Sequence, residues 1–222
     1  MMKKYLALVL LGAFSTTVCF ADAMQAPYKQ RFFYVGVTGG YGNNDWSSMV
    51  ARDGATAASG NPTAVSGEGP LFGGDFGYQI NRHLAVEAEY VQMPKTDITM
   101  SFLDVLPYQL TSKSSFASIT LKIMAPILNS NFTFFVDAGP AYQWRKDSGK
   151  WSVLPPVEGT QPVDIGTWAP IFGGGFLYRM ANNWQAEASF QYLPGTGKSV
   201  ISAMSYYIPE VYAGTFRLDY IF

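Results

Sequence analysis

Residues 70–78 read PLFGGDFGY, and residues 170–178, one hundred positions later, read PIFGGGFLY. The same offset relates residues 79–94 to residues 179–194, and nine of the 25 aligned positions are identical. Background composition predicts about one or two identities. Each copy holds two runs in which apolar side chains recur at every second position, joined by a very short connection. Because two is the period of a β-strand, the sequence predicts a repeated hairpin.

The first residues have the form of a secretory signal peptide. Two lysines precede an apolar run over residues 5–14, and residues 21–23 read ADA, a small-residue cleavage pattern. We therefore expect residues 1–21 to be removed and residues 22–222 to form one mature domain. Lipid attachment at Cys19 is the alternative, which is disfavoured because the residue before it is not small.

The composition narrows the class of protein. Charged residues make up 14% of the chain and aromatic residues 16%, whereas a typical soluble domain carries about 25% charged residues. After residue 21 no apolar run reaches the roughly 18–20 residues of a spanning helix. The net charge of −1 becomes −3 without the leader's two lysines, which disfavours nucleic-acid binding. Strands that present apolar side chains to lipid account for both the missing charge and the missing helix.

Eight segments have the alternation of strands, and most are close to the roughly 9–11 residues that a tilted strand needs to cross a bilayer. The segments are residues 31–42, 71–80, 83–93, 115–125, 132–143, 168–180, 184–193 and 210–222. The connections between them alternate between long and short, which is typical of barrels with long outer loops and short periplasmic turns. The sequence therefore predicts an all-β fold, an eight-stranded antiparallel up-and-down transmembrane β-barrel with both termini in the periplasm.

The two faces of these strands differ in charge. One face is apolar along the strands, as Phe72 and Phe76 show in the first repeat and Phe172 and Phe176 in the second. A charge on a lipid-facing position would cost about 2–4 kcal/mol at the bilayer midplane. The opposite face collects ionisable residues, which we expect in the lumen: Asp75, Glu87, Glu89, Lys122, Asp137, Arg179, Glu187, Arg217 and Asp219.

These lumen charges allow two interpretations, a solvated channel lining and a packed network of salt bridges that plugs the barrel. An eight-stranded barrel is just wide enough for side chains to fill, so the network is the favoured interpretation. The expected pairs combine the acids Asp75, Glu87 and Glu187 with the bases Lys122, Arg179 and Arg217.

The C-terminal strand ends on alternating apolar residues, namely Phe216, Leu218, Tyr220 and the terminal Phe222. This pattern resembles the C-terminal signature of outer-membrane barrel proteins. The resemblance implies recognition by the outer-membrane insertion machinery. The last strand of a soluble sheet is the alternative interpretation.

The sequence offers little catalytic chemistry. His83 is the only histidine and follows the expected turn at residues 81–82, so we interpret it as a turn residue and not as a catalytic base. The glycines at 73–74 and 173–175 lack the spacing of a phosphate-binding loop, and we interpret them as positions where barrel strands coil. We therefore predict no catalytic residue, no metal site and no cofactor.

Taken together, the leader, the eight alternating segments, the repeated hairpin and the aromatic C-terminus resemble the OmpA-like and opacity-protein-like outer-membrane barrel family over essentially the whole mature chain. The resemblance implies a bacterial outer-membrane location and a lumen plugged by Glu87, Lys122, Glu187 and Arg217. Some members of that family carry a peptidoglycan-binding domain after the barrel, and we expect none here.

Three functions stay open at this point. We favour a non-enzymatic structural and surface-interaction protein, adhesin-like, whose long loops contact the host or environment. The alternatives are a narrow pore or apolar-solute conduit, and a lipid-modifying barrel enzyme. Apolar residues within 98–108 and 200–208 indicate either strands that extend beyond the membrane or a contact surface. The expected partners are outer-membrane lipids, the insertion machinery and a ligand at the loops, without nucleic acid.

Overall fold

A computed structural model gives the structure of this chain. It describes residues 31–46, 61–102, 106–127, 130–151, 163–180, 183–195 and 208–222. The expected leader, residues 1–21, lies outside these ranges, as does most of the apolar stretch expected at 200–208. In the described part of the chain, no helix is long and apolar enough to cross a membrane.

Ten β-strands make up the structure. They are β1 (Phe32–Asp45), β2 (Asn61–Ser66), β3 (Glu68–Asn81), β4 (Leu84–Gln92), β5 (Thr96–Phe102), β6 (Leu106–Pro126), β7 (Phe132–Trp151), β8 (Val163–Arg179), β9 (Trp184–Leu193) and β10 (Glu210–Ile221). Only Gly67 separates β2 from β3, and three residues that include Pro94 separate β4 from β5. Because proline lacks the backbone donor of a sheet ladder, the break between β4 and β5 falls where the sequence predicts one. The ten strands therefore count as eight along the barrel wall.

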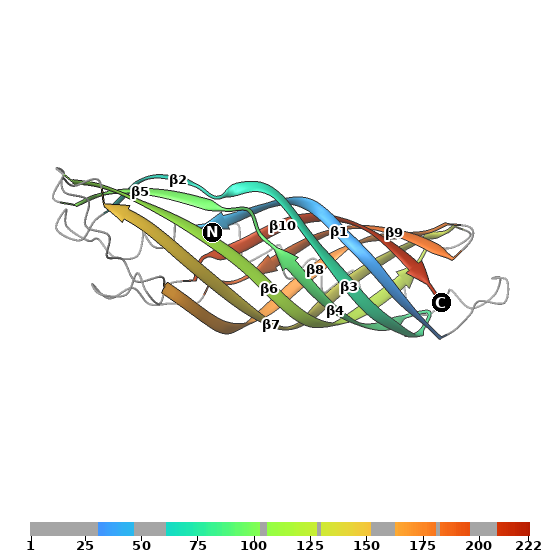
Figure 1. Cartoon of the computed structure of the whole chain (residues 1–222). Coiled ribbons are helices and arrows are strands. Elements are labelled where there is room, and N and C mark those ends of the chain that lie inside the picture. The colour runs from blue at the N-terminus through green and yellow to red at the C-terminus, as the bar shows by residue number, and fades with distance from the viewer. Residues whose placement is uncertain are drawn as a thin grey trace, which may run out of the picture.

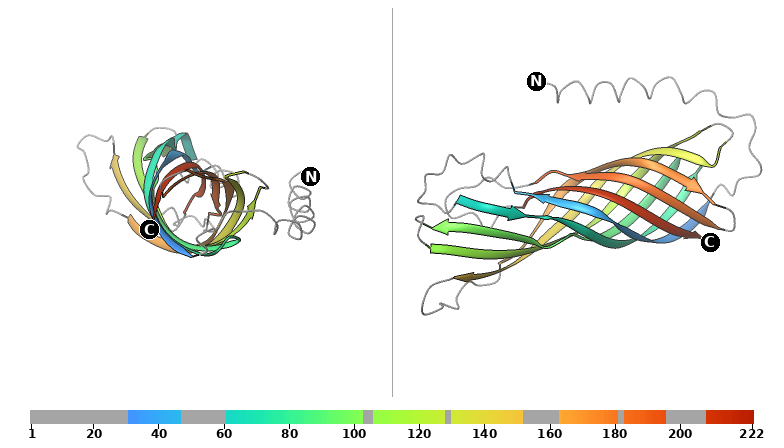
Figure 2. Two further views of the ribbon diagram at one scale, coloured as in Figure 1. Left: turned by 90° about the vertical axis from the view of Figure 1, so that its right-hand side faces the viewer. Right: turned by 90° about the horizontal axis from the view of Figure 1, so that it is seen from above.

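The sheet closes on itself. The strand β1 pairs antiparallel with both β3 and β10, and β6 pairs with both β4 and β7. The order around the wall is β1, β3, β4, β6, β7, β8, β9 and β10, so every neighbour along the chain is also a neighbour in space (Figure 1; Figure 2). Closure leaves no unpaired edge in the wall. The prediction of a closed eight-stranded antiparallel barrel is confirmed.

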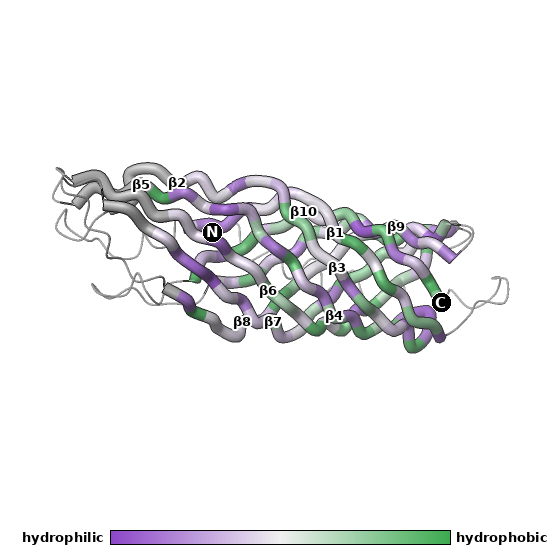
Figure 3. Tube along the Cα trace, in the orientation of Figure 1, coloured by the Kyte–Doolittle hydropathy of each residue, from purple (hydrophilic) through white to green (hydrophobic). Residues whose placement is uncertain are grey.

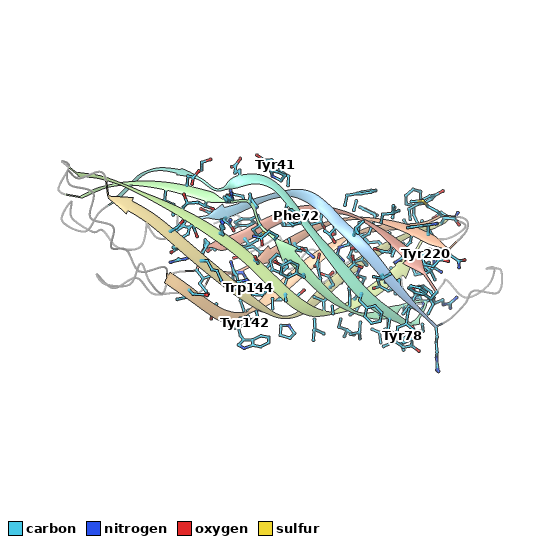
Figure 4. All side chains as sticks on the ribbon, in the orientation of Figure 1. Tyr41, Phe72, Tyr78, Tyr142, Trp144 and Tyr220 are labelled. Carbon is cyan, nitrogen blue, oxygen red and sulfur yellow. The ribbon has the colours of Figure 1, made fainter. Side chains whose placement is uncertain are left out.

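The wall has an apolar outside and a mixed inside. Hydrophilic and hydrophobic positions alternate along the barrel strands (Figure 3). Outward-facing aromatic rings remain exposed or half-buried in the isolated chain, and six of them are labelled in Figure 4: Tyr41, Phe72, Tyr78, Tyr142, Trp144 and Tyr220. At the end of the barrel that carries the long connections, the rings of Tyr142 and Trp168 lie 5.2 Å apart. At the opposite end, those of Trp184 and Tyr220 also lie 5.2 Å apart. These two groups have the arrangement of interfacial aromatic girdles.

Two glycines within the repeated hairpins allow neighbouring strands to approach closely. A Cβ atom at Gly73 would overlap the carbonyl oxygen of Tyr90, and one at Gly175 would overlap that of Ala188. Each glycine faces the lumen on a strand that is covered outside by phenylalanines. The glycines of the repeat therefore permit the coiling of a narrow barrel, as their spacing in the sequence indicates.

Several strands extend further outward than the eight expected segments, as one interpretation of the apolar residues within 98–108 indicated. The strand β6 begins at Leu106 and β7 runs to Trp151, and both cover residues expected to be loop. The ladder continues through β2, β5 and the first residues of β8, because β2 pairs with β5, β5 with β6, β6 with β7 and β7 with β8. We call this part the outer extension: β2, β5, residues 106–114, residues 144–151 and residues 163–167. It projects from one side of the barrel, at the left in Figure 1, while β1, β9 and β10 end nearer the wall.

Candidate functional site

A carboxylate held by two cations lies at the centre of the lumen. The Nζ atom of Lys122 donates to Oε2 of Glu87 at 2.7 Å, and the Tyr34 hydroxyl donates to the same oxygen at 2.9 Å. The guanidinium of Arg217 contacts the other carboxylate oxygen. All four side chains are buried, so each interaction is made away from bulk water.

The same two cations reach two further carboxylates. Lys122 Nζ lies 2.6 Å from Glu187 Oε2, and Arg217 Nη1 lies 3.3 Å from Glu187 Oε1. Arg217 Nη2 lies 2.6 Å from Glu89 Oε1. We call these five residues the lumen ion cluster: Glu87, Glu89, Lys122, Glu187 and Arg217. They bring three acids and two bases together, so charge is nearly balanced inside the cluster.

The lumen ion cluster joins opposite walls of the barrel. Glu87 and Glu89 lie on β4, and Glu187 lies on β9, four places away in the order of eight. Lys122 on β6 and Arg217 on β10 are likewise four places apart. Four places is half the circumference, and the longest salt bridges, from Lys122 to Glu187 and from Arg217 to Glu89, join strands three places apart and so span most of the width of the lumen. The cluster fills the barrel at this level instead of lining it.

The other ionisable residues expected in the lumen lie around this cluster. The Asp75 carboxylate accepts from the Thr38 hydroxyl at 3.4 Å, and Asp219 accepts from the Gln185 amide at 2.9 Å. Asp137 is buried and stands opposite Lys122 in the ladder between β6 and β7.

Arg179 lies nearer the end of the barrel with the short turns. Its Nη2 donates to Gln79 Oε1 at 3.1 Å, and its guanidinium lies 4.9 Å from the centre of the Phe32 ring. These contacts place Arg179 against an amide and an aromatic ring.

Apolar layers lie on both sides of the lumen ion cluster. Towards the outer extension the lumen holds Leu71, Val91, Met93, Phe116, Ala141, Ile171, Leu193, Val211 and Ala213. Towards the short turns it holds Ala85, Met124, Phe135 and Leu177, with Phe32, Tyr34 and Ile221 beside them. We call the first group the outer apolar layer and the second the inner apolar layer. Salt bridges between such layers are shielded from water, which strengthens them but makes any unpaired charge costly.

A second polar site lies beyond the outer apolar layer. The Arg145 guanidinium is 4.9 Å from the centre of the Trp46 ring, and its Nη2 is 2.6 Å from Asp147 Oδ2. Nearby, the Asn44 amide donates to the Pro94 carbonyl and to the Thr96 hydroxyl, each at 3.1 Å. Burial raises the pKa of the Asp147 carboxyl above its ordinary value, and the charge of Arg145 opposes that shift. These contacts fasten β1 to the base of the outer extension.

His83 lies at the end of the barrel that carries the short turns. Its backbone N–H donates to Asn81 Oδ1 at 2.8 Å, and its Nδ1 lies 3.1 Å from the Met124 carbonyl oxygen. The side chain of Arg82 contacts the other ring nitrogen. Across the described residues, no group of three or more His, Cys, Asp or Glu side chains is arranged to hold a metal ion.

Sequence reasoning missed the neutral members of the lumen. Tyr34 donates into the lumen ion cluster, and the Gln191 amide donates to Glu89 Oε2 at 2.7 Å. The apolar layers were missed as well, because Phe116 and Phe135 face inward among polar neighbours. The parity of each strand was the available signal: residues 116 and 122 differ by an even number, so both must face the lumen.

A closed antiparallel barrel with an apolar aromatic outside and buried charges inside defines an integral membrane β-barrel. The outer membrane protein beta-barrel domain model matches residues 6–220, and the chain belongs to that family. It is therefore an integral protein of the bacterial outer membrane. No curated protein matches the chain in sequence.

Three solved structures illustrate the likeness. The outer membrane protein OprG of Pseudomonas aeruginosa shares 14% identity and a TM-score of 0.57, with 87% of this chain and 97% of that chain covered. The N-terminal barrel domain of OprF from the same organism shares 14% identity and a TM-score of 0.48, with 87% and 98% covered. The attachment invasion locus protein Ail of Yersinia pestis shares 16% identity and a TM-score of 0.42, with 87% and 98% covered. At these identities the likeness to OprG shows the fold alone.

Proposed function

We propose that this protein is a non-enzymatic outer-membrane barrel that presents its outer extension and loops as a contact surface to the host or environment. In this arrangement the short turns and both chain termini face the periplasm. The observation that carries the proposal is the contrast between a lumen bridged from wall to wall and a sheet that continues past the aromatic girdle on one side only. A protein built to conduct would need the reverse, an open lumen.

The interior supports a structural role for the barrel. Phe116, Ile171 and Leu193 of the outer apolar layer have no exposed surface. Below them Lys122 and Arg217 are each held by at least two carboxylates. A hydrated ion entering here would have to displace close-packed side chains and separate buried salt bridges, both of which are unfavourable.

The outer extension supports the contact role. The outer extension is a twisted sheet in which β2 pairs with β5. On the other side of β2, the neighbouring strand β1 ends at Asp45, close to where β3 begins. Strands of this kind present backbone donors and acceptors and two faces of side chains. Loops and strand ends on a rigid scaffold are where barrels place their binding residues.

Removing the β5–β6 hairpin tests the contact role. Thr96 and Ser112 are paired, so an Asn-Gly turn can replace residues 97–111 and leave the membrane-spanning wall intact. The protein would be displayed on a Gram-negative strain that does not adhere, and bacteria bound to cultured epithelial cells would be counted. We expect adhesion with the full chain and loss of it with the trimmed chain, while heat-modifiable gel migration stays the same. Equal adhesion by both chains, or none by the full chain, would contradict the proposal.

The outer apolar layer is the observation that favours the alternative, an apolar-solute conduit, because such a layer would admit solutes without charge. Planar-bilayer recordings and uptake of an apolar dye into proteoliposomes separate the two functions. We expect neither a steady conductance level nor dye uptake above that of empty vesicles. A variant with Phe116→Ala serves as the sensitised control, because it enlarges the space in this layer.

The absence of an enzymatic role is also part of the proposal. His83 is engaged by Asn81 and Met124 at the periplasmic turn, far along the strand from the outer girdle. Mass spectrometry of lipid A from cells with and without the protein is expected to show the same masses. A new acyl or deacylated species in the expressing cells would favour the lipid-modifying enzyme.

The last strand supports the proposed recognition by the insertion machinery. Its alternating apolar side chains, Phe216, Leu218, Tyr220 and Phe222, all face outward and are exposed in the isolated chain. The Phe222 backbone N–H still donates to the Phe33 carbonyl, so the terminal residue belongs to the closing ladder between β10 and β1. Deleting Phe222 is expected to lower the amount of protein in outer-membrane fractions without changing its refolding in detergent.

A further inference from the structure

Two aspartates of the lumen converge on a glycine that lies between them. Gly36 on β1 pairs with Asp75 of β3 on one side and with Asp219 of β10 on the other, so the three residues form one row across the sheet. A Cβ atom at Gly36 would overlap Oδ1 of Asp219 and would lie 2.8 Å from Oδ1 of Asp75. Both carboxylates therefore approach the position that a side chain at residue 36 would occupy. We call Gly36, Asp75 and Asp219 the Gly36 site.

The two aspartates of the Gly36 site are incompletely paired. Each accepts one hydrogen bond from a neutral donor, Asp75 from the Thr38 hydroxyl and Asp219 from the Gln185 amide. Among the described residues, Asp75 Oδ2 and Asp219 Oδ1 have no hydrogen-bond partner. Asp75 is only 5% exposed and Asp219 only 1%, so bulk water does not solvate them. Buried carboxylates in this condition are costly unless a cation or a proton compensates their charge.

The bases of the lumen ion cluster are engaged by its own glutamates. Arg217 shares β10 with Asp219, but both of its terminal nitrogens contact glutamates of the cluster. One of these, Glu89, pairs with Asp75 in the ladder between β3 and β4 and places a further like charge beside the site. The cluster has three acids and two bases, and Asp75, Asp219 and the buried Asp137 add three more acids between the two apolar layers. This part of the described lumen therefore has an excess of negative charge.

We propose that the Gly36 site binds a divalent cation of the Ca²⁺ class between Asp75 and Asp219. Calcium binds oxygen ligands at about 2.3–2.6 Å and accepts irregular coordination. Both Oδ1 atoms lie close to one point, so a single ion can contact both carboxylates. The ion would offset the repulsion between them and would join β3 to β10 across β1.

The neutral groups around the site suit the same ion. Gln185 pairs with Asp219 in the ladder, and its buried Oε1 has no hydrogen-bond partner among the described residues. A ligand set made only of oxygen atoms favours hard cations such as Ca²⁺ over zinc or copper. The site has two carboxylates, fewer than the group of three that the described residues lack, so water would complete the coordination. The proposal departs from the expectation, drawn from the sequence, that the chain has no metal site.

Refolding with and without calcium tests the site. The apolar layers close the lumen on both sides, so the ion would be supplied while the protein refolds from urea into phosphate-free detergent micelles. One sample receives calcium chloride, and the other receives a chelator and potassium chloride at equal ionic strength, both at a mildly alkaline pH. Equilibrium dialysis with radioactive calcium measures binding. The thermal midpoint of heat-modifiable gel migration measures stability.

The test variants are Asp75→Asn and Asp219→Asn, each of which keeps the size of the side chain and removes one charge from the site. The amide oxygen introduced at position 219 can still accept from Gln185. The matched control is Asp137→Asn. Asp137 is also a buried lumen aspartate whose Oδ1 has no hydrogen-bond partner among the described residues, but that atom lies against Gly173 of β8.

We expect the wild type and Asp137→Asn to bind one calcium ion per chain and to gain several degrees in midpoint at saturating calcium. Either test variant should bind calcium at least about tenfold more weakly, because the ion loses one of its two anionic ligands. Without calcium the order of stability should reverse. Each test variant should then have a higher midpoint than the wild type, because it removes one of two facing charges.

Three outcomes would overturn the proposal. Equal calcium binding by the wild type and both test variants would place the ion elsewhere on the chain. An equal loss of binding in Asp137→Asn would assign the effect to the overall charge of the lumen. A wild type that binds no calcium, and whose midpoint rises as pH falls while that of Asp219→Asn does not, would show that the two aspartates share a proton instead of a cation.

Discussion

The closed barrel and the outer extension are parts of one sheet, yet they are held together in different ways. In the barrel every strand has two neighbours, and buried charges such as Lys122 and Glu187 pair across the lumen between strands three places apart. In the outer extension, β2 and residues 163–167 of β8 each pair with only one described strand, and the ion pair between Lys146 and Asp164 is exposed. The same ladder thus continues from a water-free interior into solvent.

The difference teaches where charge contributes to stability. A salt bridge in the barrel is desolvated on both sides by the apolar layers, so removing one partner leaves an uncompensated charge. An ion pair of the outer extension is solvated, so its loss is nearly neutral. We therefore expect substitutions of the same chemistry to have effects that differ by several kcal/mol between the two regions.

The largest effect is expected for Lys122→Met. The substitution leaves Glu87 and Glu187 without the ammonium group that lies 2.7 Å and 2.6 Å from their carboxylates. We expect the free energy of unfolding to fall by about 3–5 kcal/mol. Equilibrium unfolding by guanidinium chloride in phospholipid vesicles measures it.

Lys146→Met is the matched control in the outer extension. Its ammonium group pairs with one exposed carboxylate, so we expect a change within about 1 kcal/mol. Similar losses for Lys122→Met and Lys146→Met would refute the distinction between the two regions.

A smaller effect is expected where the barrel wall is tightest. A Cβ atom at Gly175 would overlap the Ala188 carbonyl oxygen, whereas one at Gly39 would meet no heavy atom within 4 Å. We expect Gly175→Ala to lower the free energy of unfolding by about 1–3 kcal/mol, because the backbone of β9 must shift. Gly39→Ala, measured in the same unfolding titration, should be nearly neutral. A neutral Gly175→Ala would show that the wall adjusts without strain.

The barrel was predictable from the sequence because the membrane imposes a strict pattern. A lipid-facing position such as Phe172 must be apolar, whereas a lumen-facing neighbour such as Gly173 must leave room inside the barrel. Because the two faces alternate along a strand, a period of two persists over the whole crossing. The repeat of residues 70–94 at 170–194 made that pattern visible twice. The number of strands followed from counting such segments.

The outer extension was not predictable in the same way. Beyond the girdle both faces of β6 and β7 meet polar surroundings, as Lys113 and Lys146 outside and Ser112 and Arg145 inside show. Without a difference between the faces, alternation gives no signal, and residues 106–114 and 144–151 were left outside the eight expected segments. Only the apolar residues within 98–108 indicated strands that extend beyond the membrane. The partners inside the lumen also depended on which residues share a level across a tilted barrel. Strand parity fixes the face but not the level, so the sequence could not assign a neutral partner such as Gln79 to Arg179.

The two regions should also differ in how their stability depends on pH. We expect an effect of moderate size on the stability of the outer extension. Burial raises the pKa of Asp147 in the folded state above its unfolded value. The folded state then binds the proton more tightly, so the outer extension becomes more stable as pH falls from above the folded pKa towards the unfolded value of about 3.9.

Hydrogen exchange at the amides of residues 108–114 and 145–148, corrected for intrinsic rates, measures this local stability. We expect protection to rise as pH falls through this window in the wild type and to be flat in Asp147→Asn. Arg145 keeps its contact with the Trp46 ring in that variant, which separates loss of the titrating group from loss of the whole site. Protection that falls with pH in the wild type would contradict the sign.

The smallest effect is expected for Asp164→Asn. Asp164 lies near the outer end of the ladder between β7 and β8, where it pairs with Lys146. Its side chain is 62% exposed, and its carboxylate lies 3.3 Å from Lys146 Nζ. We expect the free energy of unfolding to change by no more than about 0.5 kcal/mol at low salt, and the difference to vanish near 1 M salt, where the Debye length is about 3 Å. A variant that loses stability by several kcal/mol would place this exposed pair in the same energetic class as the lumen ion cluster, and the comparison between the two regions would fail.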